Sequence, residues 1–278
     1  MNARECFFFR YFLYTTPEVC LFSKKIHRPS TYFACGGQRI DARGKMCPMK
    51  ILAFETANDP GSVAFYDDGQ VWARQCPVGP SNSESLLPLA ESLLREAGVV
   101  TGAETSFRDL SALVFGSGPG SFTGLRVGCG VAQGLAMACE RPLLGISSLA
   151  AMAFLSGGAR VIVALDAGMG EVYYGFFEHG ELGEVGVYAP EQAPLPSSTD
   201  WLACGNGFAV YPALRERLSP WVSAWRPEIM PSAESLLPLA VPRLARGECI
   251  DPALAAPFYV RNKVAKTVAE RLSEGGKA

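Results

Sequence analysis

The sequence is poor in the residues that carry most catalytic and metal chemistry. It has two histidines, and no lysine lies between residues 51 and 262. The patterns His-x-x-x-His, His-Glu-x-x-His and Gly-x-Ser-x-Gly are absent, and no Cys-x-x-Cys pair occurs. The sequence therefore lacks the residues that metal-dependent hydrolysis and a nucleophile elbow require. An enzyme that works with carboxylates alone stays open.

Excess positive charge and long apolar runs are also missing. The formal net charge is −2, so the chain has no overall basic field for binding nucleic acid by itself. Any role with RNA would be local or shared with a partner. No window reaches the roughly 20 apolar residues that a membrane span needs. Nine cysteines without metal-ligand spacing suit a reducing compartment, so we predict a cytoplasmic protein without membrane contact.

Residues 1–48 differ from the rest of the chain. They carry eight Lys or Arg and three acids, a net charge of 8 − 3 = +5, and nine of the 29 aromatic residues. They lack the basic, apolar and small-residue regions of a signal peptide. We expect this segment to be an upstream extension without a fold of its own, with the true start at Met46 or Met49.

From Lys50 onward the pattern predicts alternating strands and helices. An Asp-Gly turn joins two of the strands, a strong hairpin signal. Leucines and alanines at helical spacing predict a helix that Gly98 ends, and Pro142 and Gly145 are expected to close a second helix. We predict strands at 50–56, 62–66, 70–75 and 110–115, and helices at about 83–97 and 122–139.

The same order then restarts, with predicted strands at 160–166 and 172–177 around a second acidic turn. The heptapeptide ESLLPLA also occurs twice, at 84–90 and 234–240. Together these repeats indicate a duplicated α/β fold. We predict an N-terminal lobe at 49–150, a C-terminal lobe at 151–257, and a C-terminal helix and tail at 258–278.

A glycine-rich stretch, GSGPGSFTGLRVG at 116–128, invites a phosphate-loop reading. It lacks the lysine of a Walker A motif and is not followed by a complete dinucleotide unit. Past Ser121, a predicted helix cap, small residues recur every fourth position in two sets: Gly124, Gly128 and Ala132, and Gly130, Gly134 and Ala138. Because glycine weakens a helix by about 1 kcal/mol, two bare faces favour close helix packing over phosphate chemistry.

Two acidic turns end the first strand of each repeat, Glu55-Thr56 and Asp166-Ala167. Ligands bind at the carboxyl ends of strands in open α/β sheets, so such a carboxylate can hold a cation while nearby N–H groups hold phosphate. The alternative is a turn-forming acid that binds its own backbone, and composition favours that reading.

Taken together, the motifs resemble the TsaB (YeaZ-like) family over about residues 49–265. The resemblance is carried by KILAFETA, GSGPGSFTGLRVG followed by VAQGLA, ALDAGMGEVYYG and FYVRN. It implies an actin-like ATPase fold, as in sugar kinases and Hsp70, built of two duplicated lobes. It also implies a subunit without catalysis of its own, whose paralogue TsaD transfers threonylcarbamoyl to the adenosine beside the tRNA anticodon.

The resemblance further implies the partners. TsaD would pair with the N-lobe helices, or a second copy would in a homodimer; the small ATPase TsaE would join, and tRNA would be reached only through the complex. No intrinsic cofactor or metal is implied, and ATP or ADP at the partner interface stays open. The residues expected at that interface are Leu86, Leu87, Leu93, Leu94, Gly124, Arg126, Gly128, Gly130, Val131 and Gly134.

The chain departs from the family at two positions, with Glu55 where many relatives have Asp and Asn82 where many have His. Both changes lead away from a phosphate or metal site. We therefore interpret Glu55, Thr56 and Asp166 as vestigial phosphate turns. The alternative hypothesis is an active ATPase or kinase that uses Glu55 and Asp166. A metallopeptidase is disfavoured by the missing histidines.

Overall fold

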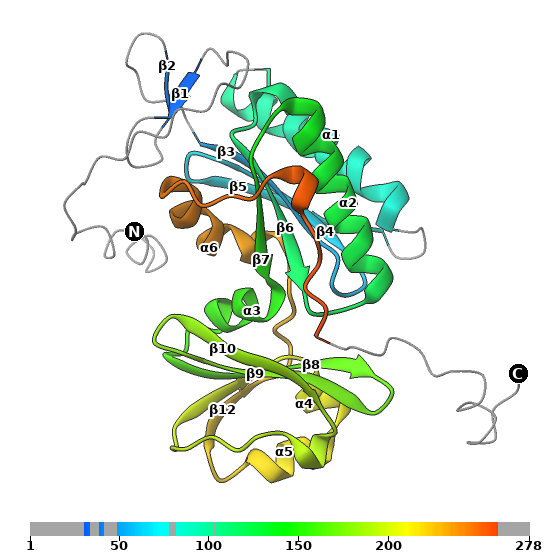
Figure 1. Ribbon diagram of the computed structural model, residues 1–278, viewed down its shortest axis with the longest axis vertical. Coiled ribbons are helices and arrows are strands. Elements are labelled where there is room, and N and C mark those ends of the chain that lie inside the picture. The colour runs from blue at the N-terminus through cyan, green and yellow to red at the C-terminus, as the bar shows by residue number, and fades with distance from the viewer. Residues whose placement is uncertain (1–30, 34–38, 42–48, 78–81, 103, 261–278) are drawn as a thin grey trace, which may run out of the picture.

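The computed structural model describes residues 31–33, 39–41, 49–77, 82–102 and 104–260 (Figure 1). Within the expected extension 1–48 it describes one short antiparallel pair, β1 (Thr31–Phe33) and β2 (Arg39–Asp41). Met46 lies outside the described residues. So does the predicted C-terminal helix, apart from residues 258–260, which are not helical.

Two five-stranded sheets form the two lobes. Their strand orders are β5-β4-β3-β6-β7 and β10-β9-β8-β11-β12. In each sheet three consecutive strands pair antiparallel, and the first of them also pairs parallel with the fourth. This shared order confirms the predicted duplicated, actin-like α/β fold. The strands are β3 (Lys50–Glu55), β4 (Ser62–Asp67), β5 (Gln70–Gln75), β6 (Ala112–Gly118), β7 (Leu143–Ser147), β8 (Arg160–Gly168), β9 (Glu171–Glu178), β10 (Glu181–Tyr188), β11 (Trp201–Cys204) and β12 (Val222–Arg226).

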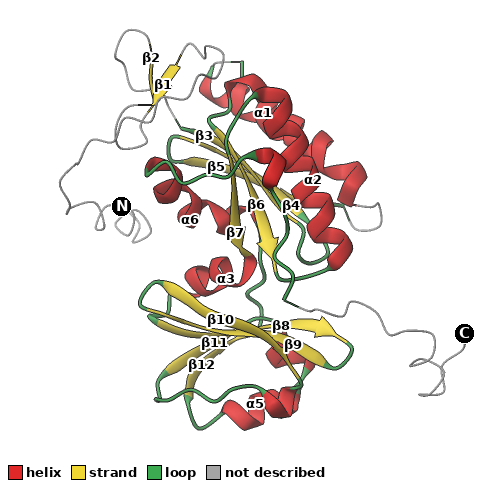
Figure 2. Cartoon of the chain, viewed as in Figure 1, coloured by secondary structure: helices red, strands yellow, loops and turns green. Residues whose placement is uncertain are grey.

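Helices cover both faces of the first sheet, and one helix lies between the lobes (Figure 2). Helices α1 and α2 lie on one face and α6 on the other, whereas α3 contacts both sheets. The helices are α1 (Asn82–Thr101), α2 (Phe122–Cys139), α3 (Ser148–Ser156), α4 (Gly207–Val210), α5 (Pro212–Leu218) and α6 (Ala233–Ala245), with 3-10 turns η1 (Phe107–Asp109), η2 (Pro190–Gln192) and η3 (Pro252–Leu254).

One predicted helix end is wrong, and one predicted closing residue of the second helix is wrong, although that helix ends at Cys139 as predicted. Helix α1 continues through Gly98 to Thr101. The glycine that ends it in the left-handed conformation is Gly102, at φ +71°. Helix α2 ends at Cys139 with Glu140 in the left-handed conformation, and Gly145 lies inside strand β7 rather than closing the helix. Neither β7 nor α3 was predicted.

The two ESLLPLA copies lie on opposite faces of the first sheet. The copy in α1 packs with Leu52 and Phe54, whereas the copy in α6 packs with Ile51 and Ala53. Alternate residues of β3 point to opposite faces, so both helices cover the same strand. Helix α6 falls in the range 151–257 that we expected to form the C-terminal lobe, but its leucines complete the core of the first lobe. The strand order, and not this heptapeptide, records the duplication.

After α6 the chain folds back over the first lobe. The backbone N–H of Ile250 donates to Leu143 O at 2.8 Å, and that of Phe258 donates to Ser117 O at 2.8 Å. Residues 250–260, here called the strap, therefore run beside β7 and α2 (Figure 1). Among the described residues, no helix combines the length and apolar character needed to cross a membrane.

Candidate functional site

The glycine-rich motif connects β6 to α2 and packs tightly against the end of β3. A Cβ atom at Gly116 would overlap the Glu55 carboxylate, and one at Gly124 would overlap Thr56 O. Gly128 faces Thr56 Oγ1 in the same way. The Thr56 hydroxyl donates to Gly124 O at 2.8 Å. These glycines therefore allow close packing within the chain, as the packing interpretation expects.

The Glu55 side chain is part of this packed region. Its side chain is buried, with Oε1 accepting from the Ala57 N–H and Oε2 from the Ser148 hydroxyl, both at 2.7 Å. Burial raises the pKa of the Glu55 carboxyl, and hydrogen bonds from Ala57, Ser148 and Thr56 oppose that shift. Glu55 thus joins β3 to α3 instead of facing a ligand. This matches the reading of an acid that binds its own backbone.

Half of the expected interface residues lie in the core of the first lobe. Leu86, Leu93 and Leu94 pack against the sheet because α1 turns its apolar stripe inward, and Gly124 and Gly128 are buried against β3. Their placement on a partner surface is corrected accordingly. Leu87 is 40% exposed, and Val131 is partly buried against the same core.

The second set of glycines lies on an open face of α2. A Cβ atom at Gly130 or Gly134 would meet no atom of the described residues within 4 Å, and both residues are exposed. Met137, one turn further, is 59% exposed. We call Gly130, Gly134, Met137 and Ala138 the open face. Helix spacing in the sequence indicated two bare faces, and the structure shows that one is filled and the other is not. Ser121 caps the helix as predicted, accepting from the Gly124 N–H at 3.3 Å.

Arg126, an expected interface residue, is held by the strap. Its guanidinium lies 3.8 Å from the Phe122 ring centroid, and its Nε donates to Tyr259 Oη at 2.9 Å. The Gln133 amide, two turns further along α2, donates to Pro252 O at 2.6 Å. The strap is thus fastened to α2 at two points, and the FYVRN motif supplies the Tyr259 contact. We had predicted no role for that motif.

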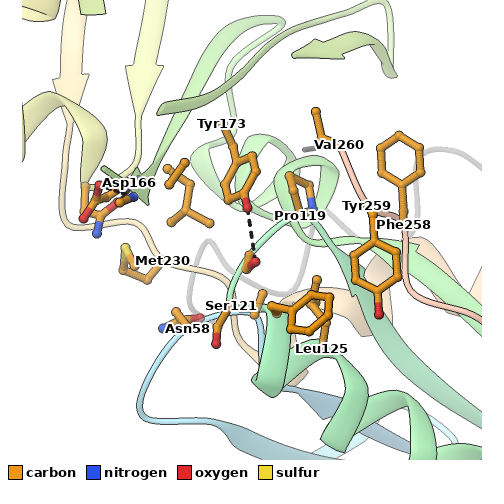
Figure 3. A pocket seen from close by; sticks show the side chains of 17 residues that line it. Asn58, Pro119, Ser121, Leu125, Asp166, Tyr173, Met230, Phe258, Tyr259 and Val260 are labelled. Carbon is orange, nitrogen blue, oxygen red and sulfur yellow. Dashed lines mark hydrogen bonds between the residues drawn. The ribbon is translucent and has the colours of Figure 1, made fainter. Parts of the chain in front are cut away.

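A cleft of about 360 Å³ lies between the lobes (Figure 3). Tyr173 from the second lobe crosses it, and its hydroxyl donates to Gly120 O at 3.3 Å. The lining residues are Ala57, Asn58, Pro119, Gly120, Ser121, Phe122, Leu125, Leu165, Asp166, Ala167, Gly168, Tyr173, Asn206, Met230, Phe258, Tyr259 and Val260.

Asp166 is the predicted site residue that reaches this cleft. Its Oδ1 accepts from the Gly168 N–H at 2.9 Å and from the Tyr211 hydroxyl at 2.7 Å. The Asn206 side chain accepts from the Asp166 N–H at 2.9 Å. Sequence reasoning missed Asn58, Tyr173 and Asn206, since an isolated Asn after a strand carries no distinctive signal. Tyr173 lies in the motif ALDAGMGEVYYG within a run of buried strand residues, so no local signal marked it as a cleft residue.

The cleft offers little to a nucleotide phosphate. Among the described residues that line it none is Lys, Arg or His, and Asp166 is the one acid. Glu55 and Asp166 do not converge, because the first is buried beneath the glycine motif and the second faces the cleft. Within the part of the chain that the structure describes, no group of three or more His, Cys, Asp or Glu residues is placed to hold a metal ion.

Comparison with known proteins identifies relatives of this chain. A model of the family "tRNA N6-adenosine threonylcarbamoyltransferase", TsaD, matches residues 79–186. The tRNA threonylcarbamoyladenosine biosynthesis protein TsaB of Escherichia coli is 38% identical over 78% of this chain and 96% of its own length. TsaB of Haemophilus influenzae is 31% identical over 78% and 95%.

Solved structures agree. YeaZ from Pseudomonas aeruginosa is 35% identical, with a TM-score of 0.66 over 76% of this chain and 99% of its own. A second Pseudomonas aeruginosa structure, described as an uncharacterized protein with similarity to peptidase YEAZ, has the same TM-score of 0.66 at 34% identity. Matches at this identity over nearly the whole length of the relatives show that the chain belongs to the TsaB family.

Proposed function

We propose that this chain is a non-catalytic cytoplasmic subunit in the biosynthesis of threonylcarbamoyladenosine in tRNA. It pairs with a TsaD-related paralogue, helps to recruit a TsaE-like ATPase, and reaches tRNA only through that assembly. The names of its TsaB relatives support the part in threonylcarbamoyladenosine biosynthesis, and the partners and the lack of catalysis are our extension of it.

The observation that carries the proposal is the open face of α2. Glycine costs a helix about 1 kcal/mol relative to alanine, so Gly130 and Gly134 weaken α2 without allowing a closer contact with any described residue of the chain. A helix from another molecule could approach closely over these positions. Leu87, on α1, is a further exposed apolar residue that such a partner could cover. A second copy of this chain is the competing occupant.

The packing of Glu55 supports a subunit without its own catalysis. A kinase or ATPase that used Glu55 and Asp166 would need both carboxylates at the phosphates, but Glu55 is held by Ser148 and Ala57 in the core. A purified chain that hydrolysed ATP, with Asp166→Asn abolishing turnover, would replace our proposal with the ATPase alternative. ATP or ADP bound only in the presence of the paralogue would fit the proposal.

The direct test is Gly130→Leu, which places a large side chain on the open face where the chain itself has no neighbouring atom. We expect the dissociation constant for the TsaD-like paralogue to rise by at least about tenfold, because a central packing contact is lost. Thermal unfolding of the isolated variant should occur at the wild-type temperature or somewhat above it, because leucine is a better helix former than glycine.

The matched control is Ala209→Leu, a similar enlargement at an exposed helical position of the second lobe. It should bind the paralogue like the wild type. Undiminished binding by Gly130→Leu would contradict the proposed interface. If the variant instead lost only self-association, the second copy would be the occupant of the open face.

A further inference from the structure

The interlobe cleft has a chemical character of its own, independent of the proposed assembly. Apolar side chains cover much of its wall, including Leu125, Leu165, Tyr173 and Met230. Asp166 is the one acid among the described lining residues, which include no Lys, Arg or His. Figure 3 shows Asp166, Asn58 and Met230 on one side and the strap residues on the other. A small-molecule site typically combines such apolar walls with a few polar groups.

Asp166 has an uncommitted oxygen at this cleft. The Gly168 N–H and the Tyr211 hydroxyl both donate to Oδ1. Among the described residues no hydrogen bond or ion pair engages Oδ2. The two donors hold the carboxylate in place, so the remaining oxygen is preorganised to accept from a ligand.

Asn58 lies on the same side of the cleft, but its Oδ1 is buried and is not exposed to a ligand there. Asp166 is therefore the described side chain that can meet a charged ligand. Arg126 is not among the described lining residues, because its guanidinium stacks on Phe122 and donates to Tyr259.

From this arrangement we infer that the cleft binds a small organic ammonium with a compact apolar body. The ammonium group donates to Asp166 Oδ2, and the body packs on Leu125, Leu165, Tyr173 and Met230. A volume of about 360 Å³ accommodates a small ligand of this kind. A triphosphate is disfavoured because it meets a carboxylate and, among the described lining residues, no cationic side chain.

The test compares three probes on the intact chain by isothermal titration calorimetry: 2-phenylethylammonium, its neutral counterpart 2-phenylethanol, and ATP. We expect the ammonium to bind at least about tenfold more tightly than the alcohol, with ATP weaker than both. Asp166→Asn should remove the preference for the ammonium and leave the alcohol unchanged, since Asn keeps the Oδ1 acceptor.

Two further variants separate charge from folding. Tyr211→Phe removes a donor to Oδ1 but keeps the carboxylate, so it should retain a preference for the ammonium. Met230→Lys places a cation in the cleft and should abolish ammonium binding. Thermal unfolding checks that each variant is folded. Equal affinity for ammonium and alcohol, tighter binding of ATP, or no saturable ammonium binding by the wild type would each overturn the inference.

Discussion

The two lobes end their first strands in different ways. Strand β3 ends at Glu55, which is 1% exposed and bonded through both carboxylate oxygens. Asp166, near the end of β8, is partly exposed at the cleft, and among the described residues its carboxylate accepts hydrogen bonds through Oδ1 and none through Oδ2. Both strands occupy the middle of sheets with the same order. One topology thus buries a carboxylate in one lobe and leaves its counterpart available in the other.

The difference comes from what packs over each strand end. In the first lobe, four glycines of one motif, Gly116, Gly120, Gly124 and Gly128, approach residues 55–57. In the second lobe, Gly205 approaches the backbone of Ala164 instead and leaves the carboxylate uncovered. The 18-residue helix α2 packs over the turn in the first lobe. The helix near the corresponding turn of the second lobe, α4, has four residues. Glycine placement, more than the acid itself, decides which turn can meet a ligand.

The largest effect should come from breaking the sealed turn with Gly124→Ala. The new Cβ would overlap the backbone oxygen of Thr56, so α2 must shift from β3. We expect a loss of about 3 kcal/mol in the free energy of unfolding, measured with urea, in line with overpacked cores. Gly130→Ala is the control: it meets no atom within 4 Å and should stabilise by up to about 1 kcal/mol. Equal stabilities for the two variants would contradict the assignment of the two faces.

A second, smaller effect concerns the pH dependence of stability. Burial raises the pKa of Glu55 in the folded state, so the folded chain binds a proton more tightly than the unfolded chain. The Glu55 contribution is therefore favourable at low pH and is lost as pH rises from the unfolded value of 4.5 through the higher folded pKa. Glu55→Gln should remove this decline. The stability of the variant relative to the wild type should therefore be higher at neutral pH than at pH 4.

Urea unfolding at several pH values measures this effect, with Asp166→Asn as the comparison at the open turn. That variant keeps the Oδ1 acceptor and should leave the decline in place. If Glu55→Gln showed the wild-type pH dependence, the carboxylate would not be the group responsible.

The smallest effect should follow from Tyr173→Phe, which removes the hydrogen bond to Gly120 across the cleft. This hydrogen bond is 3.3 Å long and partly buried, so we expect a loss of about 0.5–1 kcal/mol in the free energy of unfolding. Hydrogen exchange should quicken at the residues around Gly120 more than in the sheet of the second lobe. Uniformly faster exchange would indicate general destabilisation instead of a loosened contact between the lobes.

Much of the first lobe could be predicted from local patterns. The strands at 50–56, 62–66 and 70–75 and the helix at 122–139 were placed within about one or two residues, because alternation and helical spacing are local signals. Strand β7 and helix α3 were missed, since a short apolar run followed by small residues suits either a loop or a core element. The role of the strap was also missed, because its contacts join Tyr259 to Arg126 across 133 residues.

The sequence by itself determined the family, the duplicated α/β order and the two sets of glycines four residues apart, since motifs and periodicity are written along the chain. Only the tertiary structure decided which set is filled. Gly124 and Gly128 meet Thr56, while Gly130 and Gly134 meet nothing. It also decided that Glu55 is enclosed and Asp166 is not. Both outcomes depend on contacts between segments distant in sequence, and spacing along one helix cannot show which of its faces another strand will cover.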